Sequence, residues 1–406
     1  MIRCVVLFLL LSQAVIAQEQ EHRFYDVNFS GTFKPQRGVI EASISVQQSS
    51  QLLIQLDMAA SPDRYSGFQG DGEVEREGRR LLWSIPAEGG TLNYEVEVDH
   101  ERGLLMDAQM TQDWAILRLD DVFPAARVRS LVGAHSRSTL QLNGPGGWRF
   151  ESRYGRLNGK LGTEDPERRF DRPTGWLAAG KLGVRRTTIG ARKISVAAPR
   201  DQGMRRLDII AFTRWNLPRL VKVFPQFPDQ LLIVGARDDM WRGGLSGPDS
   251  IYLHADRPLI SENSTSPLLH ELVHLATARS SAVMADWIVE GLAEYYSLTV
   301  LLRSGGISEK RYDKAMDSLV KWAKRDKGRL RSPSSGANTA RAVQFFQMIQ
   351  TQLTRNDAGR LDTIVQELMT SETADGEQLL TLVEQQLGKP SSKLRTAYEE
   401  FSASPE

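Results

Sequence analysis

The sequence predicts an α+β protein of several domains, with strands in its first part and helices in its last. Three observations lead to this fold class. Apolar and polar residues alternate before about residue 151, strands mix with one helix over residues 193–254, and apolar residues recur at helical spacing after residue 267. The 406 residues, 41% hydrophobic and 25% charged, suffice for two or three globular domains.

Residues 18–165 are predicted to form a β-rich N-terminal domain, built as an antiparallel β-sandwich. Leu92, Tyr94 and Val96 alternate with polar residues, as in a strand with one buried face. Similar runs recur near residues 39–46, 51–58, 113–119 and 138–142, a spacing that favours a sandwich over a barrel. The histidines of this region lie far apart in sequence and are interpreted as ordinary residues: His22, His100 and His135.

A stretch rich in Gly, Pro and charge, residues 155–175, is predicted to connect this domain to the next. We expect a second domain at 172–324 and a helical C-terminal lobe at 325–406. Strands are predicted at 193–198, 231–234 and 251–254, with a helix at 206–223. Further helices are predicted near residues 267–278, 286–303, 308–324, 338–353, 359–370, 376–386 and 390–402.

The charge of the chain is nearly balanced, with 51 Lys plus Arg against 50 Asp plus Glu. No large net field is then available to hold nucleic acid or an anionic membrane surface. We therefore expect neither as a partner.

The first 17 residues have the layout of a cleavable export signal. Arg3 precedes an apolar run at 5–11, and Ala17 offers a small residue for cleavage. The run is shorter than the roughly 20 residues of a membrane-spanning helix, and no later stretch approaches that length. We expect an exported protein, periplasmic or secreted, without a stable membrane span after cleavage; retention of the signal as an anchor is the alternative. Cleavage would also remove Cys4, the one cysteine.

The sequence HELVH at residues 270–274 predicts half of a metal site. Ser266 and Pro267 favour a helix start just before it, as N-cap and first-turn residues. His270 and His274 are four residues apart, so both imidazoles project from one helix face and can share a metal. Glu271 lies beside the open position of that metal.

A protease-type zinc site needs a third protein ligand and keeps its fourth position for water. Glu290, sixteen residues after His274 and near the start of the next predicted helix, can supply it. Glu294 lies one turn further on the same face, where it could accept the remaining N–H of a ligand histidine. The alternatives are that Glu290 is a helix-capping acid and that Glu294 is a solvated residue.

HELVH followed by WIVEGLAEYY (residues 287–296) resembles the gluzincins of the peptidase MA superfamily, in particular the glycyl aminopeptidase and membrane-alanyl aminopeptidase-like families. The resemblance implies a thermolysin-like zinc peptidase fold for the second domain, with Zn²⁺ as cofactor and peptides as substrates. It makes His270, His274 and Glu290 the zinc ligands, Glu271 the general base and Glu294 the acid four positions after the third ligand. The interval before Glu290 is shorter than in membrane-alanyl aminopeptidases.

The stretch WRGGLSGPDSIYLHAD at 241–256 extends the resemblance, because these families carry a Gly-rich edge strand about thirty residues before HExxH. In them the strand binds the substrate backbone by strand addition. The corresponding residues are Gly243, Gly244, Leu245 and Ser246. Simple turn residues are the alternative reading of the glycines.

Two departures from the family pattern bear on function. Glycyl aminopeptidases have a Glu where this chain has Ser246, so the acid that would bind a substrate amino terminus is missing. Many relatives also use a tyrosine to stabilise the reacting carbonyl, for which Tyr312 and His254 are the weak candidates. The sequence thus predicts a zinc peptidase. The alternatives are an exported, non-catalytic binding or assembly protein that keeps a structural zinc site, and a different zinc hydrolase.

Overall fold

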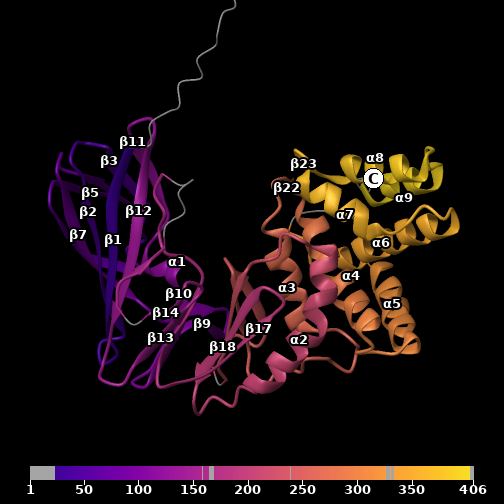
Figure 1. The fold of residues 1–406 in the computed structure, drawn as a ribbon, viewed down its shortest axis with the longest axis horizontal. Coiled ribbons are helices and arrows are strands. Elements are labelled where there is room, and N and C mark those ends of the chain that lie inside the picture. The colour runs from indigo at the N-terminus through magenta and orange to yellow at the C-terminus, as the bar shows by residue number, and fades with distance from the viewer. Residues whose placement is uncertain are drawn as a thin grey trace, which may run out of the picture.

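The computed structural model describes residues 23–157, 159–163, 169–237, 239–325, 330 and 333–402. The expected signal peptide and His22 lie outside them. Figure 1 shows β-sheets at the N-terminal end of the molecule, helices at the C-terminal end, and a mixed sheet with helices α2 and α3 between them. The predicted α+β fold with a β-rich N-terminal part and a helical C-terminal lobe is confirmed.

The N-terminal part begins with two sheets that enclose one apolar core. The first has the strand order β15 (Leu161–Gly162), β12 (Ala134–Asn143), β1 (Arg23–Lys34), β2 (Val39–Gln47), β7 (Gly89–Glu97) and β4 (Tyr65–Gly70). The second has the order β11 (Ala126–Ser130), β3 (Leu53–Ala59), β6 (Arg80–Ser84) and β5 (Glu73–Glu77). Leu92, Tyr94 and Val96 of β7 are buried, as their alternation predicts.

The prediction of purely antiparallel pairing is wrong at one place. Strands β1 and β12 pair in parallel, with Arg23 opposite Ala134 and Thr32 opposite Asn143. Parallel neighbours need a crossover connection, and here the chain passes through the other strands of this region before β12 returns beside β1. Period-two alternation reports which face of a strand is buried, and it carries no information on the direction of the neighbouring strand.

A further six-stranded sheet joins this part to the rest of the chain. Its order is β14 (Gly155–Leu157), β13 (Arg149–Ser152), β16 (Trp176–Gly180), β10 (Trp114–Arg118), β9 (Leu105–Met110) and β8 (His100–Arg102), with the short helix α1 (Leu119–Val122) after β10. Every residue of β16 is buried, because Leu177 and Ala179 face the N-terminal core while Trp176 and Ala178 face the mixed sheet. The sheet thus draws on residues from both sides of the predicted connector.

The mixed sheet has the order β17 (Leu182–Ile189), β18 (Arg192–Pro199), β19 (Gln230–Val234), β21 (Ser250–Leu253) and β20 (Gly244–Gly247). Strands β18, β19 and β21 run parallel, and helix α2 (Arg206–Val223) makes the crossover between the first two. Strand β20 returns antiparallel to β21 and forms the edge of the sheet.

Seven helices after the mixed sheet form the C-terminal third of the described chain. They are α3 (Pro267–Thr277), α4 (Asp286–Ser304), α5 (Glu309–Ala323), α6 (Ala337–Arg355), α7 (Leu361–Thr370), α8 (Gly376–Leu387) and α9 (Ser392–Ser402). Two short strands, β22 (Val283–Met284) and β23 (Thr373–Ala374), pair beside them. The predicted helices agree with these bounds to within two residues. In the described residues no helix has the length and apolar character needed to cross a membrane.

Candidate active site

Helix α3 presents its two histidines because its other face is buried. The Ser266 hydroxyl caps the helix by accepting the Leu269 N–H at 3.2 Å, and Pro267 occupies the first turn. Leu269, Leu272 and Val273 pack into the core of the mixed sheet and helices. With that face occupied, His270 and His274 project together on the opposite side.

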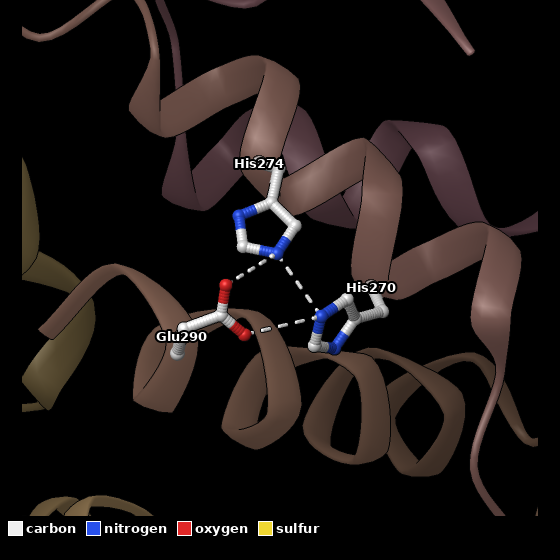
Figure 2. Close-up of side chains that lie close together, drawn as sticks. All are labelled: His270, His274 and Glu290. Atoms are coloured by element: carbon white, nitrogen blue, oxygen red, sulfur yellow. Dashed lines mark hydrogen bonds and ion pairs between the residues drawn. The ribbon is translucent and has the colours of Figure 1, made fainter. Parts of the chain in front are cut away.

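The two imidazoles meet a carboxylate from helix α4, as Figure 2 shows. The Nε2 atoms of His270 and His274 are 3.0 Å apart. The two oxygens of Glu290 lie 3.6 Å from the His270 Nε2 and 3.5 Å from the His274 Nε2. One donor atom from each residue falls within 4.8 Å of the other two, which makes the group a possible metal site.

Glu294 contacts the far side of the first histidine. Its carboxylate lies 3.4 Å from the His270 Nδ1, the nitrogen that does not face the cluster. A hydrogen bond at this nitrogen fixes the orientation of the ring and leaves Nε2 as the metal-binding atom. The structure thus brings all four predicted residues of the metal site together.

The position of helix α4 depends on Gly291, the residue after Glu290. A Cβ atom at Gly291 would lie 2.6 Å from the Ala342 Cβ and 2.8 Å from the Phe346 ring, so the missing side chain lets α4 approach α6 closely. Gly291 therefore has a packing role, and it helps to set the position along helix α4 from which Glu290 reaches the histidines.

The electrostatics of the cluster are strongly coupled. Burial disfavours protonation of His270, but hydrogen bonds to Glu290 and Glu294 outweigh it and raise the pKa of His270 to about 10. Burial and the charge on His270 lower the pKa of His274 to about 4. Burial acts to raise the pKa of Glu290, yet its hydrogen bond with His270 and the charges of both histidines lower it overall. One carboxylate facing two imidazoles suits a shared cation.

Glu271 is buried between helix α3 and the edge strand β20. A Cβ atom on Gly244 would lie 2.5 Å from the Glu271 Cγ and 2.9 Å from its Oε1, so only glycine fits there without moving the carboxylate. Burial raises the pKa of Glu271, although His270 and hydrogen bonds from the Ser246 hydroxyl and backbone lower it in part. The predicted base and the predicted substrate-binding strand are therefore direct neighbours.

A residue far away in sequence, Trp176, holds both the edge strand β20 and its neighbour β21. The Trp176 Nε1 donates to the Leu245 carbonyl at 2.9 Å, and the Trp176 N–H donates to the Ser250 Oγ at 2.8 Å. Both bonds come from β16 of the neighbouring sheet. No sequence pattern singles out Trp176, because its role depends on the packing of β16 against the mixed sheet.

A cleft of about 570 Å³ extends from His274 of the candidate metal site along the β20–β21 turn. It is lined by Arg153, Ser246, Gly247, Pro248, Asp249, His274, Leu275, Ala278 and Arg279. Arg153, Asp249 and Arg279 carry its charge, and none of them was a candidate from the sequence. They come from three separate segments, so no local pattern could have joined them.

Tyr312 and His254 are not among the three clustered donors. The Tyr312 hydroxyl is 3.5 Å from the Thr299 Oγ1, which ties helix α5 to helix α4, and burial raises its pKa. The His254 Nδ1 accepts the Asp256 N–H at 3.2 Å, and the side chain lines a small cavity with Arg205 and Ile209. The contact of Tyr312 is thus with helix α4. Those of His254 are with Asp256, with the start of helix α2 and, through its N–H, with the Gly243 carbonyl.

Comparison with known proteins agrees with this geometry. Residues 269–365, which contain HELVH and both candidate glutamates, match the family model of the M61 glycyl aminopeptidases. A comparison with curated proteins gave no significant match. The resemblance to the aminopeptidase-like gluzincins expected from the motifs is confirmed.

Solved structures share the fold over most of the chain. An aminopeptidase N family protein from Idiomarina loihiensis superposes with a TM-score of 0.72 at 13% identity, over 94% of this chain and 76% of that one. Native yeast LTA4 hydrolase superposes with a TM-score of 0.57 at 14% identity, over 95% of this chain and 68% of that one. At these identities the likeness shows the fold, and together with the family match it supports a peptidase.

Proposed function

We propose that the protein is an exported, zinc-dependent peptidase that hydrolyses peptide bonds. One observation carries the proposal: two histidine Nε2 atoms and one carboxylate converge beside a buried glutamate that touches an edge strand. A metal site, a base and a surface for an extended peptide thus adjoin one another.

The donor set fits zinc. Two imidazole nitrogens and one carboxylate oxygen are the ligands of a catalytic His₂Glu site, and their mutual distances leave room for one shared ion. Zinc held by His270, His274 and Glu290 would lower the pKa of a bound water to about 7 and polarise the scissile carbonyl. Glu294 would keep the His270 ring oriented through Nδ1.

Glu271 would serve as the general base. It is not one of the three clustered donors, it adjoins them in sequence and it is buried against β20. Its raised pKa makes the carboxylate a better proton acceptor than an exposed glutamate. In the reaction it would accept the proton of the attacking water and deliver it to the nitrogen of the leaving amine.

Strand β20 would hold the substrate backbone. The His254 N–H donates to the Gly243 carbonyl at 3.0 Å, so Gly243 turns its main-chain groups toward β21. In an antiparallel pair these directions alternate, which turns the main-chain groups of Gly244 and Ser246 toward the open edge. The Ser246 N–H already bonds Glu271, so the Gly244 groups and the Ser246 carbonyl are the ones left for a substrate. A peptide strand can pair there, within reach of Glu271.

Elemental analysis combined with cleavage of a peptide library tests the proposal. Wild type should carry one zinc per chain and cleave peptides. His274→Ala removes one of three ligands and should lose most of the metal and the activity. Equal zinc in both proteins would refute the assigned site.

The bond preference is tested with a peptide and its N-acetylated twin. Because Ser246 stands where relatives have the amine-binding acid, we expect both twins to be cleaved at similar rates. Strict loss of cleavage on acetylation would instead show an aminopeptidase.

Export is tested by N-terminal sequencing, which should begin at or near Gln18. An intact Met1 on a cytoplasmic product would contradict it.

A second candidate is an exported, non-catalytic binding or assembly protein with a structural zinc site. One observation favours it: the hydroxyl of Tyr312, a sequence candidate for stabilising the reacting carbonyl, contacts Thr299. This candidate predicts a full complement of zinc with no cleavage of any peptide in the library.

A further inference from the structure

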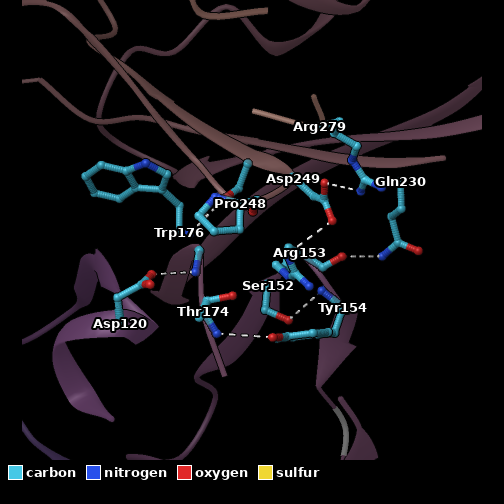
Figure 3. Close-up of polar contacts among 12 residues, drawn as sticks. Asp120, Ser152, Arg153, Tyr154, Thr174, Trp176, Gln230, Pro248, Asp249 and Arg279 are labelled. Atoms are coloured by element: carbon cyan, nitrogen blue, oxygen red, sulfur yellow. Dashed lines mark hydrogen bonds and ion pairs between the residues drawn. The ribbon is translucent and has the colours of Figure 1, made fainter. Parts of the chain in front are cut away.

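Asp249, which lines the cleft, joins two arginines, as Figure 3 shows. Its Oδ2 lies 3.2 Å from the Arg153 Nη1, and its Oδ1 accepts from the Arg279 Nη2. The Asp249 and Arg153 side chains are only 20% and 19% exposed, whereas that of Arg279 is 43% exposed. Two guanidinium groups thus share one carboxylate.

Three separate segments build this group, and their positions are fixed. Arg153 lies in the turn between β13 and β14, Asp249 in the turn between β20 and β21, and Arg279 just after helix α3. Asp249 has a φ of 46°, a left-handed conformation that is uncommon outside glycine, and its two ion pairs help to hold it there. The Arg153 carbonyl also accepts the Gln230 amide at 2.8 Å.

The charges of this group do not cancel. One carboxylate faces two guanidinium ions, which leaves one positive charge at the wall of the cleft. Each guanidinium has five donors in a planar fork that matches a carboxylate. Arg279, the more exposed of the two, can receive a second carboxylate from the solvent side.

A substrate strand would reach this group from the metal site. His274 and Ser246 line the same cleft as both arginines. From His274 to the end of helix α3 at Thr277 the chain rises about 4.5 Å at 1.5 Å per helical residue, and Arg279 follows two residues later in a turn. The separation corresponds to about two residues of an extended peptide. Strand β20 continues from Ser246 to Gly247 in the same cleft, so added pairing would guide a peptide into it.

We propose that Arg279, which Asp249 holds beside Arg153, binds a carboxylate of the peptide substrate about two to three residues from the cleaved bond. The inference rests on the proposed peptidase function and names the substrate class of the same site: peptides with an acidic group at that distance. The carboxylate can come from an Asp or Glu side chain or from the end of the peptide chain.

A binding experiment tests this without depending on turnover. Fluorescent Ala- and Ser-rich nonapeptides carry one Glu, or Gln in its place, at each position in turn, with either a free or an amidated C-terminus. Binding to the zinc-loaded Glu271→Gln protein is followed by anisotropy. In one register the Glu peptide should bind about 5- to 10-fold more tightly than its Gln twin, as expected for a partly exposed charge-assisted contact.

The peptide ends separate the two sources of the carboxylate. If the free-acid peptides bind more tightly than the amidated ones while the Glu and Gln twins bind alike, the group recognised is the chain terminus. If the Glu and Gln twins differ with either end, it is a side chain. Equal binding across the whole set would overturn the proposal.

Matched arginine variants locate the effect. Arg279→Gln should abolish the preference while the zinc content and Tm stay near those of the parent. Arg279→Lys keeps the positive charge and loses the planar guanidinium, so it should keep part of the preference for Glu peptides. The control is Arg395→Gln, because the Arg395 side chain is also 43% exposed and pairs with Glu384 in the helical lobe. A preference that survives in both Arg279 variants would overturn the assignment.

Cleavage by wild type is scored separately from binding. Selective binding of Glu peptides without any cleavage would refute the peptidase and leave the carboxylate site standing. Cleavage with no preference for Glu in any register would support the peptidase and refute the carboxylate site. The two proposals can therefore fail independently.

Discussion

The candidate site has two walls, which differ in how they are built. The helical wall, formed by α3 and α4, carries the five side chains proposed to bind the metal, to support a ligand or to move the proton, all within residues 270–294. The strand wall, formed by β20 and its turn, depends on Trp176, whose bond to the Leu245 carbonyl spans 69 residues of sequence. The wall that would do the chemistry is local in sequence, whereas the wall that would hold the substrate is supported from a distant sheet.

This difference suggests separable roles for the two walls. Substitutions on the helical wall should act on the chemical step or the metal. Substitutions on the strand wall should act on substrate binding, except where a strand residue touches the base. The predictions below test that division, from the largest expected effect to the smallest.

Glu271→Gln tests the base of the helical wall. The amide cannot accept the water proton, so kcat should fall about 10²- to 10⁴-fold, while zinc content and Tm stay unchanged. Peptide kinetics and elemental analysis measure both. Cleavage at the wild-type rate would show that Glu271 is not the base.

Gly244→Val tests the one point where the two walls touch. A Cβ here meets the Glu271 Cγ at 2.5 Å, so the variant should move the base as well as obstruct the peptide. We expect kcat/KM to fall by about 100-fold, or about 2.7 kcal/mol, with part of the loss in kcat. Gly243→Ala is the comparison, because a Cβ there meets Trp241 at 2.4 Å and not Glu271. Equal losses in kcat for both variants would contradict the direct contact.

Glu294→Gln tests the support of the first histidine. The carboxylate lies 3.4 Å from the His270 Nδ1, and loss of such a partner typically lowers metal affinity or activity about 10- to 100-fold. Zinc dissociation measured with a competing chelator should show the lower metal affinity. An unchanged zinc affinity together with full activity would make Glu294 a solvated helix residue.

Trp176→Phe tests the strand wall alone. The variant keeps most of the apolar packing and removes the hydrogen bond to the Leu245 carbonyl, which is worth about 1 kcal/mol. We expect KM to rise about 3- to 5-fold and kcat to stay the same, which is the reverse of the effect of Glu271→Gln. A fall in kcat without a change in KM would show that the strand wall also positions the base.

Much of the fold could be predicted from the sequence because its signals are local. Ser266 and Pro267 mark the start of α3, and the apolar spacing of later segments gives the helices to within two residues. Parallel pairing of β1 with β12 could not be predicted, because alternation specifies a buried face and not a partner. The participation of β16 in a sheet with β10 and β13 likewise depends on packing.

The sequence by itself determined the two pairs of residues of the candidate metal site, His270 with His274 and Glu290 with Glu294, because residues four apart on a helix share a face whatever surrounds them. It therefore named His270, His274, Glu290 and Glu294, and the structure brings them together. Only the tertiary structure decided that Gly244 lies against Glu271 and that Asp249 joins Arg153 to Arg279. These neighbours come from segments that meet only when sheets and helices pack, and no periodicity along the chain encodes which surfaces will meet.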